Sequence, residues 1–101
     1  MTTMKAIWSV YIIRTVDDRL YSGVTTDVVR RFREHLTGGP RAAKYLRAHP
    51  PEALVFVMPI GARSLAHKVE YHLKRLPRER KEDVIRRQRI VFDADSGRIA
   101  A

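Results

Sequence analysis

The segment KAIWSVYIIRTVDDRLYSGVT, residues 5–25, decides the predicted fold. Both of its ends are rich in β-branched and aromatic residues, and the polar VDDR between them is a turn signal, so we predict a β-hairpin. A loop with an odd number of residues, such as residues 17–19, places Tyr11 and Tyr21 on one face of this hairpin. The rings then lie about four residue steps apart and line a groove, whereas an even loop separates them. Strand tyrosines also stabilise a hairpin simply by packing across it.

A basic helix is predicted directly after the hairpin. Apolar residues recur there at helical spacing, at Val28, Phe32 and Leu36. Thr25 or Thr26 can cap the start of this helix, and the TGGP sequence at residues 37–40 ends it.

Charged side chains flank the apolar stripe of this helix. Three of them follow one another at intervals of four, namely Asp27, Arg31 and His35. Arg30 and Arg33 project further from the stripe, where they can contact a nucleic-acid backbone or only solvent. On spacing alone, Arg31 is explained more simply as a solvated arginine paired with Asp27 or Glu34. His35 is equally explained as a cation at the negative end of its helix.

The next part of the chain predicts a short helix and a strand. RAAKYLRA, residues 41–48, can form the helix, and its Lys44 and Arg47 are candidates for contacts with nucleic-acid phosphates. The prolines of HPPE, residues 49–52, end it. The nearly continuous apolar run ALVFVMPI, residues 53–60, predicts a central strand that is buried on both faces.

Two further helices are predicted after this strand. Ser64 can cap the first, whose apolar stripe comprises Leu65, Val69, Leu73 and Leu76, and RERKEDVIRRQ, residues 78–88, forms the second. Glu70 lies at the edge of the stripe, and it is the acidic residue that we expect nearest the core. One carboxylate there can hold a hard cation such as Mg²⁺. An ordinary ion pair with Lys74, four residues on, explains the same glutamate without metal.

The order ββα(α)βαα predicts an α+β fold in which helices flank a small three-stranded antiparallel sheet. The chain has 101 residues, which is enough for one domain, and we assign residues 1–90 to it. The last residues, 91–101, form a tail that can fray.

The charge of the chain indicates a polyanionic partner. Lys and Arg together number 20 against 11 Asp and Glu, a formal net charge of +9, and arginine suits phosphate oxygens. The sequence has no cysteine, which excludes disulfides and thiolate metal sites and fits a reducing compartment. No stretch approaches the ~20 apolar residues of a membrane span. We therefore expect a cytoplasmic protein without a membrane partner.

The ordered motifs resemble those of the GIY-YIG endonuclease domain, in particular its small stand-alone bacterial members. Ser9-Val10-Tyr11 stands where this family has Gly-Ile-Tyr, and Tyr21-Ser22-Gly23 where it has Tyr-Ile-Gly. Arg31 follows ten residues after Tyr21, at the place of the family's helix arginine, and His35 at the place of its His or Tyr. Glu70, which opens EYHLKRL, stands in the place of the metal-binding glutamate. The resemblance spans residues 7–76 or more.

The resemblance implies metal-dependent hydrolysis of phosphodiester bonds. In this scheme Glu70 holds Mg²⁺ or Mn²⁺. Arg31 donates to the phosphate as its negative charge is redistributed. Tyr11 activates the attacking water, and Tyr21 and His35 place that water or relay its proton. Since a phenol with a pKa near ~10 is a poor base, Tyr11 needs a nearby cation or an acceptor such as His35.

The substrate expected from this resemblance is DNA selected by structure rather than by sequence, in repair or processing, by a chain assumed to be monomeric. Arg30, Arg33, Lys44 and Arg47 are the predicted nucleic-acid contacts. The alternative is a non-catalytic nucleic-acid-binding module or adaptor on the same fold. The chain contains no asparagine, so the family's frequent C-terminal Asn has no counterpart, and this feature favours the alternative. A basic protein that meets nucleic acid through charge alone is a third, simpler hypothesis.

Overall fold

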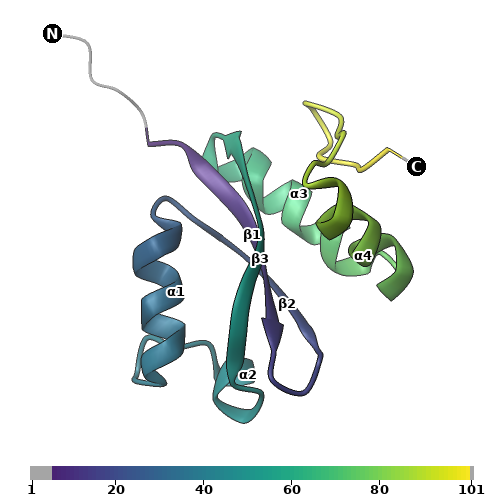
Figure 1. The fold of residues 1–101 in the computed structure, drawn as a ribbon. Coiled ribbons are helices and arrows are strands. Elements are labelled where there is room, and N and C mark those ends of the chain that lie inside the picture. The colour runs from purple at the N-terminus through teal and green to yellow at the C-terminus, as the bar shows by residue number, and fades with distance from the viewer. Residues whose placement is uncertain (1–5, 101) are drawn as a thin grey trace, which may run out of the picture.

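The computed structural model describes residues 6–100, and Figure 1 shows the three strands and four helices of this part of the chain. The elements in chain order are β1 (Trp8–Thr15), β2 (Leu20–Thr25), α1 (Val28–Thr37), α2 (Lys44–Ala48), β3 (Pro51–Gly61), α3 (Arg63–Arg75) and α4 (Arg78–Arg87). Both pairs of strands are antiparallel, so the predicted element order and α+β fold class are confirmed. Lys5, predicted to begin the first strand, lies outside the described residues. None of the helices described is long and apolar enough to cross a membrane.

The sheet has the order β2-β1-β3, so β1 is its central strand. The prediction that the run at residues 53–60 forms the central strand is therefore wrong, because β3 lies at an edge. Burial on both faces is also wrong for most of β3, since Phe56 is its one fully buried residue and the others are half-buried or exposed. Pro51 and Pro59 cannot donate to a sheet ladder, and proline within a strand favours an edge position.

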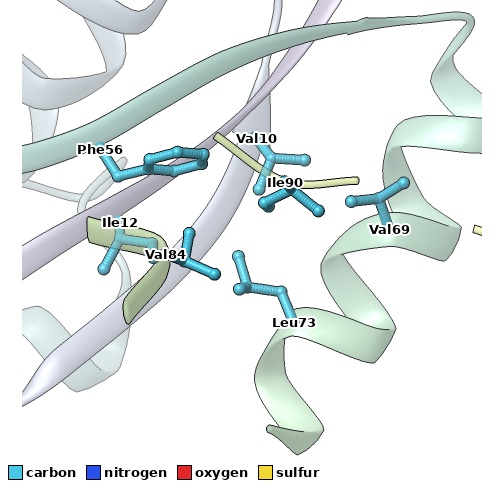
Figure 2. Packing of buried hydrophobic residues seen from close by; sticks show 7 residues of the cluster. All are labelled: Val10, Ile12, Phe56, Val69, Leu73, Val84 and Ile90. Atoms are coloured by element: carbon cyan, nitrogen blue, oxygen red, sulfur yellow. The ribbon is translucent and has the colours of Figure 1, made fainter. Parts of the chain in front are cut away.

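Alternate residues of β1 belong to two separate cores on opposite faces of the sheet. Val10 and Ile12 pack with side chains of β3, α3, α4 and the segment after α4; Figure 2 labels this cluster as Val10, Ile12, Phe56, Val69, Leu73, Val84 and Ile90. Tyr11 and Ile13 belong to the second cluster, with Leu46 of α2 and partly buried residues of α1. The two-residue period of the strand thus places Tyr11 on the face covered by α1 and α2.

The start of α1 differs from the prediction. Asp27 is the N-cap, because its carboxylate accepts the backbone N–H of Arg30 at 3.1 Å. Thr25 instead uses its hydroxyl to accept the backbone N–H of Asp27 at 3.1 Å, and Thr26 is not the cap. The predicted cap of α3 is also wrong, since α3 follows Ala62 and Ser64 lies inside the helix.

The buried face of α1 is rotated from the predicted stripe. Leu36 is 52% exposed, whereas His35 is only 1% exposed. Phe32 and Val28 still pack against the cluster around Tyr11, as predicted. The helix therefore turns an imidazole rather than a leucine toward the sheet at its C-terminal end.

The C-terminal residues contact one another and α3. Phe92 and Ile99 form an antiparallel bridge, and the backbone N–H of Ala100 donates to the carbonyl of Val91 at 2.8 Å. Gly97, with φ +71°, turns this segment so tightly against α3 that a Cβ there would lie 2.6 Å from the Cβ of Lys68. This segment thus contacts α3 at Gly97, and the expectation that residues 91–101 form a tail that can fray stays a prediction. The assignment of residues 1–90 to one domain stays a prediction.

Candidate active site at the β2 edge

The two tyrosines of the hairpin lie on one face and close together. Tyr11 pairs with Gly23, and Tyr21 pairs with Ile13, so the tyrosines are diagonal neighbours two residue steps apart. The backbone N–H of Thr15 donates to the carbonyl of Arg19 at 2.9 Å, which closes a three-residue loop over residues 16–18. This loop is odd, as the one-face arrangement requires, but it begins one residue earlier than the example at residues 17–19. With this loop the two tyrosine rings still lie on one face, but their separation along the strands is half of the predicted one.

Gly23 makes room for the ring of Tyr11. A Cβ on Gly23 would lie 2.4 Å from the hydroxyl oxygen of Tyr11 and 2.5 Å from the ring carbon that carries it. The phenol therefore lies directly over β2 and is 2% exposed. The close approach explains why this edge of the sheet needs glycine opposite Tyr11.

His35 of α1 lies beside both tyrosines. Its Nε2 lies 3.0 Å from the hydroxyl oxygen of Tyr11, and its ring meets that of Tyr21 edge-on, with centroids 5.5 Å apart. Burial, together with the positive charge of Arg31, lowers the pKa of His35 to about 4. The imidazole is therefore neutral at pH 7.

The hydrogen-bond partners of His35 fix its tautomer. Its Nδ1 accepts the backbone N–H of Ala43 at 3.3 Å, and an amide can only donate. We therefore assign the single hydrogen of the neutral ring to Nε2, which donates it to the oxygen of Tyr11. The hydrogen of the Tyr11 hydroxyl is then left for a different acceptor. In this arrangement His35 donates to Tyr11, so it is not the acceptor that was one of the two partners expected for this phenol.

Both phenols are protonated at neutral pH. Burial, with a smaller effect of Tyr21, raises the pKa of Tyr11 to about 12, and burial also raises the pKa of Tyr21. The charge of Arg31 lowers both values and the charge of Glu70 raises them. A guanidinium and a carboxylate thus act on the same two hydroxyl groups.

Arg31 is held between α1 and the segment before α2. Its Nη1 donates to Glu34 at 3.1 Å and to the backbone carbonyl of Arg41. The bond from Arg31 is the main reason that the pKa of Glu34 is lowered. The pairing with Glu34 anticipated from the helix spacing is therefore present, while Asp27 caps the helix.

Glu70 lies on α3, which covers the opposite face of the sheet, and its charge raises the pKa of both tyrosines. Its side chain is 16% exposed and lies 3.5 Å from the Nζ of Lys74, so the ion pair offered as the simple explanation exists. Within residues 6–100, no group of three or more His, Asp or Glu side chains could hold a metal ion. A single carboxylate nevertheless fits Mg²⁺, which commonly takes one or two protein carboxylates and completes its shell with water and substrate phosphates.

The four cations predicted to contact nucleic acid lie on α1 and α2, the helices on the Tyr11 face of the sheet. Arg30, Arg33, Lys44 and Arg47 are all exposed. Tyr45 was not among the predicted site residues, but its ring stacks on that of Tyr21, with centroids 6.1 Å apart and planes 21° apart. The spacing of Tyr45 and His49, an aromatic residue and a histidine four positions apart at the predicted short helix, was the sequence feature that could have indicated it. The cavity of about 770 Å³ is lined by α4 and C-terminal residues, so it is separate from these side chains.

The buried neutral His35 predicts a pH-dependent stability. Its pKa is about 4 in the folded chain and 6.5 when unfolded, so the unfolded chain binds more protons between these values. The contribution of His35 to the free energy of unfolding is fully present above pH 6.5. About 3 kcal/mol of this free energy is lost as the pH falls toward 4. Urea unfolding at pH 7 and pH 4 should show a smaller loss for His35→Gln than for wild type. Equal losses in the two proteins would contradict the burial of a neutral imidazole.

The chain is similar to known proteins in sequence and in structure. The profile of the GIY-YIG catalytic domain matches residues 7–83. A UPF0213 protein of Enterobacter sp. (strain 638) is 49% identical over 78 residues, which cover 77% of this chain and 74% of that protein. The UPF0213 protein YhbQ of Escherichia coli (strain K12 / DH10B) is 46% identical over 78 residues, covering 77% and 76%. The solution NMR structure of a UPF0213 protein from Bacillus halodurans superposes with a TM-score of 0.52 at 35% identity, covering 81% of this chain and 85% of that one.

Proposed function

The chain belongs to the GIY-YIG family, and we propose that it is a metal-dependent endonuclease that hydrolyses phosphodiester bonds in DNA. The family implies a nuclease with a nucleic-acid substrate. One observation carries the proposal: the charges of Arg31 and Glu70 both act on the hydroxyl groups of Tyr11 and Tyr21. These four side chains come from four elements, two strands of the sheet and one helix on each of its faces, and a purely structural role gives no reason for them to converge.

In the proposed mechanism, Tyr11 holds the attacking water. Its pKa of about 12 makes the resting phenol a poor base at pH 7, so we assign it a positioning role. The Tyr11 oxygen accepts a hydrogen bond from His35, which leaves its own hydrogen for the water or a phosphate oxygen. Tyr21 packs edge-on against the imidazole of His35 and thereby keeps that donor in place.

The charged groups act on the phosphate. Arg31 donates to a non-bridging oxygen as the water attacks phosphorus and the bond to the leaving oxygen breaks. Glu70 is the residue that would hold Mg²⁺ or Mn²⁺, and such a cation supplies further positive charge to the phosphate and to the leaving oxygen. Both contributions are electrostatic, and both are made at the edge of β2.

Substrate binding is assigned to the exposed cations around the site. The DNA backbone would be contacted by Arg30 and Arg33 on α1 and by Lys44 and Arg47 on α2. Such contacts depend on the shape of the DNA rather than on its sequence. We propose a role in DNA repair or processing in the cytoplasm, with the chain acting as a monomer.

Neutralising two of these cations should change the salt dependence of binding. We expect Arg30→Ala combined with Arg33→Ala to reduce the slope of log K against log salt by about 2, since each phosphate contact contributes about 1. Fluorescence anisotropy with a labelled oligonucleotide at several salt concentrations measures this slope. Arg86→Ala on α4, where Arg86 pairs with Asp83, is the control and should leave the slope unchanged. An equal slope in the double variant and in wild type would remove α1 from the binding surface.

The adaptor hypothesis keeps one supporting feature, which is the absence of asparagine from the chain. The two hypotheses separate in one experiment. Labelled single-stranded, duplex, flap and branched DNA is incubated with the protein in Mg²⁺ or Mn²⁺, with and without chelator. Cleavage that chelator abolishes is the expected result. Binding to these DNA forms without cleavage in either metal would favour the adaptor.

A further inference from the structure

A cationic and aromatic cluster lies on α3 beyond the proposed site. It consists of Trp8 from the start of β1 and of Arg63 and His67 from the first two turns of α3. The Arg63 guanidinium carbon lies 5.4 Å from the centre of the Trp8 ring, and the ring centres of His67 and Trp8 are 6.0 Å apart. Arg63 and His67 are exposed, and Trp8 is half-buried.

Arg63 differs from Arg14 and Arg31 in its partners. Arg14 and Arg31 are bound by carboxylates. In the part of the chain that the structure describes, no carboxylate pairs with Arg63 or His67. The aromatic ring orders the guanidinium of Arg63 without using its N–H donors, because the cation–π contact involves the face of the ring. An ordered cation with unused donors is suited to bind an anion.

The cluster is aligned with the proposed site along one helix face. Arg63, His67 and Glu70 follow at i, i+4 and i+7, so they share one side of α3. Arg63 and Glu70 are separated by about 10 Å along the helix axis, at ~1.5 Å per residue. A nucleic-acid strand covers this distance in about three nucleotide steps of ~3.4 Å.

We propose that Trp8, Arg63 and His67 form a second phosphate-binding site for the DNA strand that is cut at Glu70, a few nucleotides from the scissile bond. Arg63 donates to the phosphate, His67 adds a second donor, and Trp8 holds Arg63 in place. This inference rests on the proposed function, because it takes the same DNA strand as its ligand. It adds an anion contact on α3 to those assigned on α1 and α2.

Trp8 gives a direct readout of this site, because it is the single tryptophan of the chain. The experiment titrates the wild-type protein with a labelled DNA oligonucleotide in the presence of chelator, so that no cleavage occurs. Label anisotropy reports binding anywhere on the protein, and tryptophan emission reports binding at Trp8. We expect both signals to change over the same DNA concentrations.

A matched pair of variants on α3 tests the role of Arg63. Arg63→Ala should raise the dissociation constant about tenfold, as for the loss of one charge-assisted contact. It should also lower the salt slope by about 1. Arg63→Lys should restore part of the lost affinity and part of the lost salt slope. Arg75→Ala is the control, because Arg75 lies over the ring of Tyr71, 5.3 Å from its centre, on the same helix.

The outcomes distinguish this inference from the proposed function. An anisotropy change without a change in tryptophan emission, or equal losses in Arg63→Ala and Arg75→Ala, would overturn the second phosphate site alone. The absence of any anisotropy change would overturn the proposed function together with the inference.

Discussion

Replacing Glu70 with glutamine should lower the single-turnover rate of DNA cleavage by about a thousandfold, since it removes the carboxylate proposed to bind the cation. Glutamine keeps the size of the side chain, so the fold should persist. This variant also loses the ion pair with Lys74 at 3.5 Å. The pair is partly exposed and contributes at most about 1 kcal/mol to the free energy of unfolding. The dissociation constant for DNA in chelator should change little. The measurements are rapid-quench cleavage at saturating protein and anisotropy binding.

Lys74→Ala is the matched control for this variant. It breaks the same ion pair from the other side and leaves the carboxylate of Glu70 in place. We expect Lys74→Ala to retain cleavage within about tenfold of wild type, because the removed charge does not bind the cation. If the two variants lose activity equally, the function of Glu70 is the ion pair, and the metal-binding assignment is wrong.

Gly23→Ala should have the second-largest effect, because its new methyl group would lie 2.4 Å from the Tyr11 hydroxyl oxygen. The ring of Tyr11 must then move away from His35, and a displacement of about 1 Å can cost a hundredfold in rate. The forced packing should also destabilise the fold by about 1–3 kcal/mol. Urea unfolding and single-turnover cleavage measure the two losses.

Gly39→Ala is the control for the glycine substitution. The nearest neighbour of a Cβ on Gly39 is the Thr37 hydroxyl at 3.9 Å, an ordinary contact. It should therefore leave rate and stability close to those of wild type. A Gly23→Ala protein that matches Gly39→Ala in both measurements would show that the position of Tyr11 does not depend on Gly23.

Local patterns predicted the elements of this fold better than they predicted their neighbours in space. The hairpin and the helix around Phe32 follow from periodicity within about ten residues. Strand order does not follow from such periodicity. The apolar run of β3 favours a central strand, whereas Pro51 and Pro59 favour the edge position that the structure shows. Short-range patterns carry little information about which strand lies between the other two.

The site shows the same limit at the level of side chains. Tyr11 and Tyr21 are neighbours because the hairpin loop begins one residue earlier than in the predicted example. This shift of the loop by one residue changes the strand register by two residues. The bond between Tyr11 and His35 joins residues 24 apart in the chain, and the tautomer depends on the backbone of Ala43. The residue types of the site were therefore predictable, whereas the direction of its hydrogen bonds required the folded chain.

In the proposed mechanism the hydroxyl of Tyr11, held by His35 at the edge of β2, takes part in phosphodiester hydrolysis. The most direct test is the single-turnover cleavage rate of Tyr11→Phe beside wild type, on the best substrate of the DNA panel and at saturating protein. Phenylalanine keeps the buried ring and removes only the hydroxyl. We expect Tyr11→Phe to cleave about a hundredfold more slowly than wild type, with DNA affinity unchanged. Equal rates for the two proteins would contradict it.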